Sequence, residues 1–141
     1  MENIKRYIRN HEKFMDIISM IYRLLGLNRV SGRRKLYLRW QGSFLKKSKI
    51  INQGKNNELI VEKGCRIYKL RIRFFGDNNR VIIRNDCVLN NVEIWISDGS
   101  TTEIGHNTHF TGDTHIACIE GKTVHIGERC LLAEQTVFRT G

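Results

Sequence analysis

Hydrophobic and polar positions repeat along the C-terminal two thirds of the chain with a period of about 22 residues, which is typical of proteins built from stacked structural repeats. Each repeat begins with a branched aliphatic residue, has a small residue four positions later and has another apolar residue six positions later. Four segments share this pattern: VEKGCRI from Val61, IRNDCVL from Ile83, IGHNTHF from Ile104 and IGERCLL from Ile126.

A second set of apolar or small positions follows in each repeat and alternates with outward positions. Its members are Leu70, Ile72 and Phe74, then Val92, Ile94 and Ile96, then Thr114, Ile116 and Cys118, then Thr136, Phe138 and Thr140. This alternation predicts short strands with one face turned inward. The step between these sets is constant, whereas Ile104 follows Ile83 one position early. The turn before Ile104 is therefore one residue shorter than in the preceding repeat, and the segment before Thr114 is one residue longer.

Turn segments separate the predicted strands, and their Gly and Asn residues tolerate the positive φ of tight corners. They are GKNN at Gly54, GDNN at Gly76, SDGS at Ser97 and EGK at Glu120. The pattern predicts an all-β solenoid, whose stacked coils bury aliphatic side chains in columns. Each fully buried aliphatic side chain stabilises the fold by about 1.5–3 kcal/mol. An irregular β-sandwich is the competing interpretation. The solenoid requires Val61 to lie above or below Ile83, and Cys65 above or below Cys87.

The four cysteines fit the solenoid as small core residues. Cys65, Cys87 and Cys130 occupy the small position of the repeat, and Cys118 occupies an inward position of the third coil. Their spacing contains no CxxC pair and no nearby His spacing typical of zinc, so we expect no metal site. Cys65 and Cys87 would lie one coil apart, but reduced thiols that fill the core are the favoured interpretation.

The N-terminal segment has a different pattern. Apolar residues from Ile4 to Leu25 follow three-and-four spacing, which predicts an amphipathic α-helix that stops at Gly26. A basic link and an alternating segment, KLYLRWQGSF, lead into the coils. We therefore divide the chain into a basic N-terminal helix and lead-in strand at 1–49 and a β-helix at 50–141. We expect the helix to cap the open start of the solenoid or to pack on a neighbour.

Positive charge is concentrated in the N-terminal third. Residues 1 to 50 contain thirteen Lys or Arg and three acids, which accounts for the whole net charge of +10, while the remainder has eleven of each sign. This segment is the candidate for anionic partners, and contact of 1–49 with an anionic membrane surface is the second interpretation of its helix. Nucleic-acid binding is disfavoured because no recognised binding module is present. The apolar stretch from Phe14 to Leu25 is interrupted by polar residues, and no secretory signal is evident. We expect a cytoplasmic protein, free or at the inner face of the membrane.

The segments IGHNT and IGERC resemble the hexapeptide pattern, an aliphatic residue followed by Gly, two variable residues and a small one. Together with THIACIEG and the terminal FRTG, they resemble bacterial acyltransferases found with capsule and other surface-polysaccharide genes. The resemblance covers residues 50 to 141 and implies a left-handed parallel β-helix. It also implies a homotrimer that binds acetyl-CoA between neighbouring β-helices. Such a protein transfers acetyl to a hydroxyl or amine of a saccharide, with a His as general base.

The resemblance also identifies candidate residues. In this family FRTG usually continues into Asp-Ser-His, whose His is the expected base, whereas this chain stops at Gly141 in the fourth coil. We therefore expect a fragment that is catalytically inactive as it stands. Within the chain, His115 stacked on Glu93 is the candidate catalytic pair, and Trp95 and Arg139 are candidates for the acyl-donor groove, with Arg139 positioned for a CoA phosphate. His11, His106, His109 and His125 are expected to be structural or solvated. The main rival is a non-catalytic β-helix that assembles or binds glycan.

Overall fold

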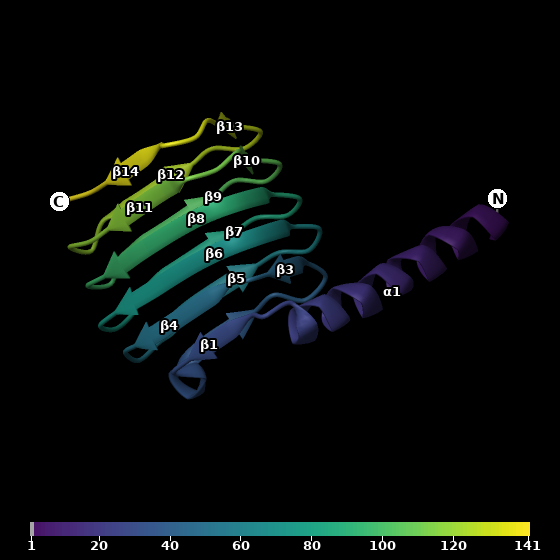
Figure 1. The fold of residues 1–141 in the computed structure, drawn as a ribbon, viewed down its shortest axis with the longest axis horizontal. Coiled ribbons are helices and arrows are strands. Elements are labelled where there is room, and N and C mark those ends of the chain that lie inside the picture. The colour runs from purple at the N-terminus through teal and green to yellow at the C-terminus, as the bar shows by residue number, and fades with distance from the viewer. Residues whose placement is uncertain (1) are drawn as a thin grey trace.

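The structure is a computed structural model that describes residues 2–141, without the side chains of residues 8, 9 and 12. It consists of a long helix followed by fourteen strands wound into stacked coils (Figure 1). The helix is α1 (Glu2–Leu25), and a single 3-10 turn, η1 (Arg33–Lys35), interrupts the first coil. The strands are β1 (Arg29–Ser31), β2 (Leu36–Arg39), β3 (Phe44–Lys46), β4 (Lys49–Gln53), β5 (Asn57–Val61), β6 (Arg66–Phe75), β7 (Arg80–Ile83), β8 (Val88–Ser97), β9 (Thr101–Ile104), β10 (His109–Phe110), β11 (Thr114–Cys118), β12 (Thr123–Ile126), β13 (Leu131–Leu132) and β14 (Val137–Arg139).

The coils form a three-sided prism, and strands on each side pair in parallel with those one coil away. One side carries β3, β10, β13 and the first residues of β6 and β8; the second carries β1, β4, β11, β14 and the remainder of β6 and β8. The third side is the five-stranded sheet β12-β9-β7-β5-β2. β6 and β8 span two sides because each bends at a residue with positive φ, Lys69 (57°) and Asn91 (55°).

The winding is left-handed. In Figure 1 the near strands β4, β6, β8 and β11 run from right to left while the chain climbs from β1 towards β14. A right-handed coil would cross the near side in the opposite direction. The predicted fold class, a left-handed parallel β-helix with an N-terminal α-helix, is confirmed.

The strand register confirms the predicted repeat. Val61 pairs with Ile83 at the full step of the repeat, and Ile83 pairs with Ile104 at a step one position shorter. The pairs on either side of this irregularity, Phe75 with Ser97 and Val92 with Thr114, keep the full step. The missing residue therefore falls in the turn between β8 and β9, and it is regained before β11, as expected. Parallel pairing between successive coils excludes the sandwich.

The coils begin earlier in the chain than the boundary expected at residue 50. β1, β2 and β3 already pair in parallel with β4, β5 and β6. The step from Arg29 to its partner Lys49 is two positions shorter than the period, and the step from Leu36 to Asn57 is one position shorter. The turns of the first coil that precede β3 are therefore shorter, and the steps of β1 and β2 do not match the period from which the boundary was predicted. β3 already pairs with β6 at the full step.

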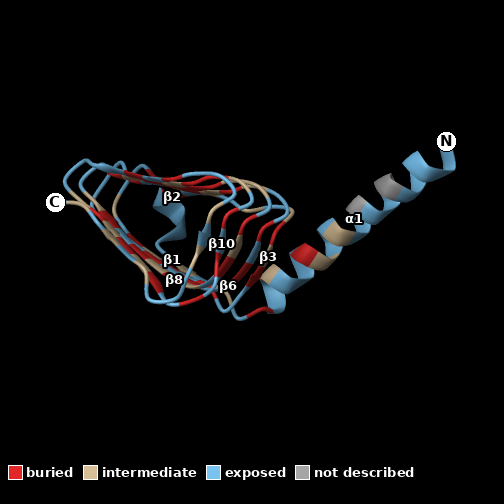
Figure 2. Cartoon of the chain, turned by 90° about the horizontal axis from the view of Figure 1, so that it is seen from above, coloured by how far each residue is buried: buried red, intermediate tan, exposed pale blue. Residues whose placement is uncertain are grey.

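Inward side chains stack in columns, which form the core. Figure 2 shows the buried residues distributed along the strands of the prism. Ile72, Ile94 and Ile116 lie one above the other and are fully buried. The four cysteines are free thiols, and Cys65, Cys87 and Cys118 are buried. Cys65 and Cys87 occupy equivalent corner positions, and each donates its S–H to a carbonyl oxygen of the following coil, at 3.1 Å. They act as small core residues, as predicted.

The helix α1 projects away from the coils (Figures 1 and 2). It ends at Leu25, and Gly26 donates its N–H to the Tyr22 carbonyl oxygen at 2.6 Å, so the predicted stop is correct. Its last turns pack beside β3, where the rings of Tyr22 and Phe44 meet edge to face at 5.7 Å. The expectation that α1 caps the open start of the solenoid is therefore wrong, because its C-terminal turns are fixed to one side of the prism. No described helix has an apolar stretch long enough to span a membrane.

Candidate functional site

Three polar side chains form a ladder on the second side of the prism, at outward positions of β6, β8 and β11. The register places Arg71 next to Glu93 and Glu93 next to His115. Arg71 Nη2 lies 3.3 Å from Glu93 Oε2, and His115 Nδ1 lies 3.4 Å from Glu93 Oε1. Glu93 and His115 are each about a quarter exposed. The predicted stacking of His115 on Glu93 is thus present in the structure.

This geometry is suited to proton transfer. Because Nδ1 of His115 faces a carboxylate, Nε2 is the ring nitrogen directed away from Glu93. A neutral imidazole with this orientation can accept a proton at Nε2, and the carboxylate stabilises the imidazolium that results. Arg71 holds the other carboxylate oxygen of Glu93 and so limits its rotation.

Trp95 borders His115 on a second side. The two ring centroids are 4.9 Å apart and the planes are nearly perpendicular, at 85°. Trp95 is on β8 in register with Ala117, which is in turn in register with Arg139. Trp95 remains 40% exposed, because the small Ala117 above it leaves part of the indole uncovered. The structure therefore brings Trp95 to His115, whereas Arg139 lies two coils along the same column.

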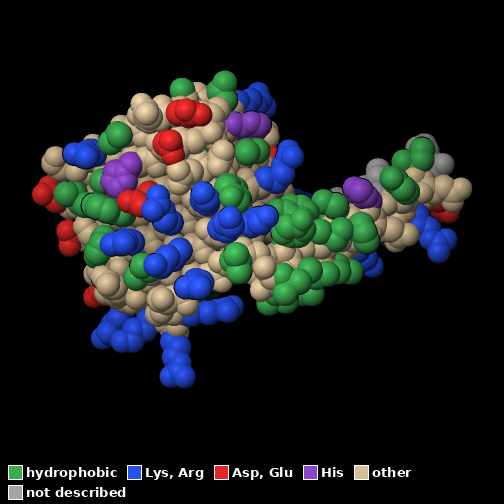
Figure 3. Space-filling view, in the orientation of Figure 1, with side chains coloured by type: hydrophobic (Ala, Val, Ile, Leu, Met, Phe, Trp, Pro, Cys, Tyr) green, Lys and Arg blue, Asp and Glu red, His purple; other side chains and the backbone are tan. Residues whose placement is uncertain are grey.

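A basic column leads to this cluster from the first coil. Arg29, Lys49 and Arg71 are in register on β1, β4 and β6, directly below Glu93. They border an open groove with Lys47 and Lys69, and Figure 3 shows Lys and Arg side chains gathered over this part of the molecule. The charge pattern of the sequence placed the basic region in the first third of the chain. The repeat predicts that the basic region continues into β6, because Lys69 follows Lys47 at the full step and Arg71 follows Lys49 at the full step.

The remaining histidines differ from His115 in their surroundings. His106 Nδ1 lies 2.8 Å from Glu128 Oε2, and His125 Nδ1 lies 3.6 Å from Glu103 Oε2. Both pairs span one coil, as Glu93 and His115 do, and His125 is 60% exposed. A carboxylate neighbour alone therefore does not single out His115. The edge contact with Trp95 and the adjoining basic column distinguish His115 from the other two histidines.

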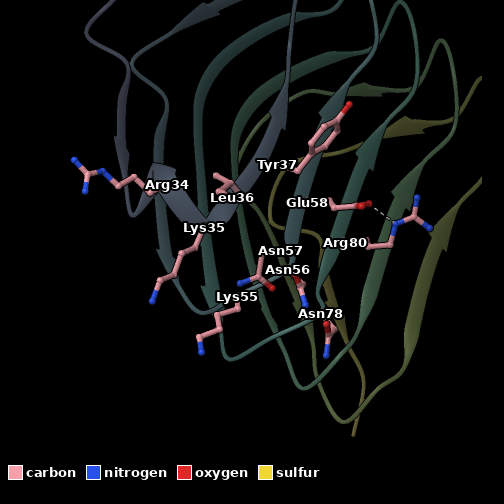
Figure 4. Close-up of a pocket in the computed structure, with 10 residues that line it drawn as sticks. All are labelled: Arg34, Lys35, Leu36, Tyr37, Lys55, Asn56, Asn57, Glu58, Asn78 and Arg80. Atoms are coloured by element: carbon pink, nitrogen blue, oxygen red, sulfur yellow. Dashed lines mark hydrogen bonds and ion pairs between the residues drawn. The ribbon is translucent and has the colours of Figure 1, made fainter.

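A second hollow lies over the first two coils, where the second and third sides meet (Figure 4). Arg34, Lys35 and Lys55 border it, opposite a salt bridge of 2.8 Å between Arg80 Nε and Glu58 Oε2. In Figure 4 the three cationic side chains point away from Arg80 and Glu58, so they do not converge on one ligand position. The hollow also lacks a histidine or cysteine among its lining residues. It is therefore not a candidate active site.

Among residues 2–141, no group of three or more His, Cys, Asp or Glu side chains is placed to hold a metal ion.

Comparison with known proteins supports the fold. No protein-family model matches the chain, and no curated protein is similar to it in sequence. Among solved structures, the chain is similar to the crystal structure of the polySia specific acetyltransferase NeuO, with a TM-score of 0.63 and 24% sequence identity. The similarity covers 77% of this chain and 52% of that chain, so this chain spans about half the length of NeuO. At this identity the similarity shows a shared left-handed β-helix, a fold that carries an acetyltransferase in the neighbour.

Proposed function

We propose that this protein is an acyltransferase that moves an acetyl group from acetyl-CoA to a hydroxyl or amine of a saccharide. The observation that carries the proposal is His115, fixed between the Glu93 carboxylate and the Trp95 indole on an outward side of the β-helix. An isolated hydroxyl is a weak nucleophile at neutral pH, and a positioned imidazole supplies about 10²–10⁴-fold by removing its proton during attack.

The proposed reaction proceeds in two proton transfers. His115 Nε2 takes the proton of the acceptor hydroxyl while its oxygen attacks the thioester carbonyl carbon. The tetrahedral intermediate then collapses, the C–S bond breaks, and the imidazolium returns the proton to the CoA sulfur. Glu93 stabilises the imidazolium, which exists only between these two transfers. Its effect is therefore on turnover more than on substrate binding.

Two further residues fit the acyl donor. The exposed part of Trp95 offers an apolar wall for the pantetheine arm. Arg139, in the same outward column, offers a cation for a CoA phosphate. In the proposed homotrimer a neighbouring β-helix forms the other wall of this groove. We place this trimer in the cytoplasm.

The acceptor we propose is an anionic saccharide of the cell surface. The column contains one basic residue in each of three successive coils, about 4.8 Å apart: Arg29, Lys49 and Arg71. Arg71, the last of them, lies beside Glu93. A chain of negatively charged sugars laid along this column would place a hydroxyl near His115. The neighbour's own description as polySia specific agrees with a saccharide acceptor.

The test is acetyl transfer by the protein, measured by mass spectrometry with acetyl-CoA and a panel of acidic and neutral polysaccharides. We expect His115→Ala to lower kcat/KM by about 10²–10⁴-fold and Glu93→Gln to lower kcat with little change in KM. The matched control is His125→Ala, because His125 also faces a carboxylate one coil below but lies on another side of the prism. If His115→Ala and His125→Ala are equally active, His115 is not the base.

The second candidate function is a β-helix that binds glycan without catalysis. It is favoured by the basic groove, which needs no catalytic base in order to bind an anionic glycan. Equilibrium binding of the same polysaccharides separates the two. Binding that is abolished by Lys49→Glu, together with no acetyl transfer by the unmodified protein, would establish the second function instead of the first.

A further inference from the structure

The helix α1 carries an apolar side that no described part of the chain covers. Tyr7, Phe14, Ile21 and Leu25 follow helical spacing and are 44–76% exposed, and Leu24 beside them is 75% exposed. From the same spacing, Lys5 lies on the opposite side of the helix and Lys13 lies at the edge of the apolar side. Side chains of this size are normally buried in a folded protein, so a continuous exposed set marks a contact surface.

Basic and aromatic residues of the first side of the prism continue this surface. Lys46 and Arg66 are exposed at outward positions of β3 and β6, and Tyr68 is in register with Lys46. Lys47 Nζ lies 3.4 Å from the Tyr68 hydroxyl, and Lys69 Nζ lies 5.4 Å from the centre of its ring. The ammonium of Lys47, donating to this hydroxyl, lowers the pKa of Tyr68. Figure 3 shows this basic area beside the apolar side chains of α1, on one face of the molecule.

We propose that this combined surface, the apolar side of α1 with Lys46, Arg66 and Tyr68, binds the surface of an anionic membrane. A helix with an apolar side, basic residues around it and no capacity to span the bilayer lies in the interface, with its apolar side among the acyl chains. Lysine and arginine next to it then meet the phospholipid headgroups, and a tyrosine suits the boundary between them.

A second copy of the chain fits the same surface less well. All of the net charge of +10 lies in residues 1 to 50. Pairing two α1 helices through their apolar sides would bring two such segments together, and like charges repel. An anionic bilayer instead supplies the opposite charge next to the apolar phase.

The proposed contact is separate from the proposed active site. None of its residues belongs to the cluster of Glu93, Trp95 and His115 or to the column of Arg29, Lys49 and Arg71. Loss of membrane binding and loss of acetyl transfer can therefore be produced by different variants.

Flotation of the full chain with vesicles tests the proposal. The probes are vesicles of phosphatidylcholine alone and of phosphatidylcholine with phosphatidylglycerol, at low and at high salt. We expect binding to the anionic vesicles only, weakened by salt. Replacing two basic residues, Lys46→Glu with Arg66→Glu, is expected to lower the partition coefficient at least about tenfold, since each Lys or Arg near an anionic surface contributes about fivefold.

The apolar contribution is tested with Phe14→Asp together with Leu24→Asp, which is expected to abolish flotation. Leu131→Asp and Lys122→Glu are the matched controls, because both residues are exposed on late coils away from α1, and they are expected to bind as the unmodified protein does. Circular dichroism verifies that each variant is folded. Binding that ignores lipid charge, or that survives the Phe14 and Leu24 changes, overturns the proposal. So does an absence of vesicle binding combined with an oligomer that these changes dissociate, because α1 would then pack on a second copy.

Discussion

Truncation of Ile94 to alanine measures how far stacked columns stabilise this protein. Ile94 is fully buried in β8, between Ile72 of the coil below and Ile116 of the coil above. The change removes three carbon atoms from a column that has neighbours on both sides, so little of the cavity can collapse. Truncations of this kind lower the free energy of unfolding by about 2–5 kcal/mol, and Ile94→Val by about 0.5–1.5 kcal/mol.

The assay is urea denaturation followed by circular dichroism, with the free energy of unfolding extrapolated to water. Val137→Ala is the matched control, because Val137 is an outward residue of β14 with 55% exposure, and its change is expected to be within about 0.5 kcal/mol. If Ile94→Ala and Val137→Ala are equally destabilising, the columns are not the main source of stability. A loss for Ile94→Val close to that for Ile94→Ala would likewise contradict a rigid, closely packed column.

Two other changes test polar features of the corners. Asn79→Ala is expected to lower the free energy of unfolding by about 2–4 kcal/mol in the same assay, because the buried Asn79 amide oxygen accepts from the N–H groups of Gly99 and Ser100 and both would lose their partner; no loss would show that water replaces the amide. Lys47→Met is expected to return the pKa of Tyr68 upward towards its ordinary value, since the Lys47 ammonium that favours the phenolate is removed. An ultraviolet titration of the tyrosines measures it, and an unchanged curve would contradict the contact.

The repeat in the sequence was sufficient to predict the coils because their core requires it. Columns such as Ile72, Ile94 and Ile116 need an apolar residue at the same position of each coil, so the period is visible in the sequence. The same step correctly placed His115 over Glu93 and Ala117 over Trp95, since outward residues follow the same register. Neighbours within a column were therefore predictable. Side-chain distances across columns, such as the contact of Trp95 with His115, were not.

The first coil was missed because its turns break the period. The steps from β1 and β2 to their partners fall short of the period by two positions and one position, and the inward partner of Leu36 is the polar Asn57. Asn57 is buried without penalty because its amide donates to the Asn52 side chain at 2.7 Å and to the Gly76 carbonyl oxygen at 2.8 Å. A pattern based on aliphatic residues does not detect such a position.

One corner of the prism was also hidden from the sequence. Residues at this corner have positive φ once in every coil, but none of them is glycine: Lys47, Lys69, Asn91, Asp113 and Gln135. Turns were predicted only at segments that contain glycine, such as GDNN at Gly76, so the bends inside β6 and β8 were not predicted. The direction of α1 was unpredictable for another reason: its apolar side specifies that it contacts something, but not what.

Stacking also explains why the identification of a catalytic histidine in this fold requires more than a carboxylate neighbour. The constant period places side chains in vertical contact over the whole prism, and three Glu–His pairs result, at Glu93 with His115, Glu103 with His125 and His106 with Glu128. A general base must in addition be held in one orientation and lie where an acceptor can bind. Only the pair on β8 and β11, among these three, has an aromatic ring against the imidazole. A cation on the carboxylate does not distinguish it, because Arg84 binds Glu103 as Arg71 binds Glu93. The cations continue below Arg71 to Lys49, so an anionic acceptor bound to this column reaches His115 and neither of the other two histidines.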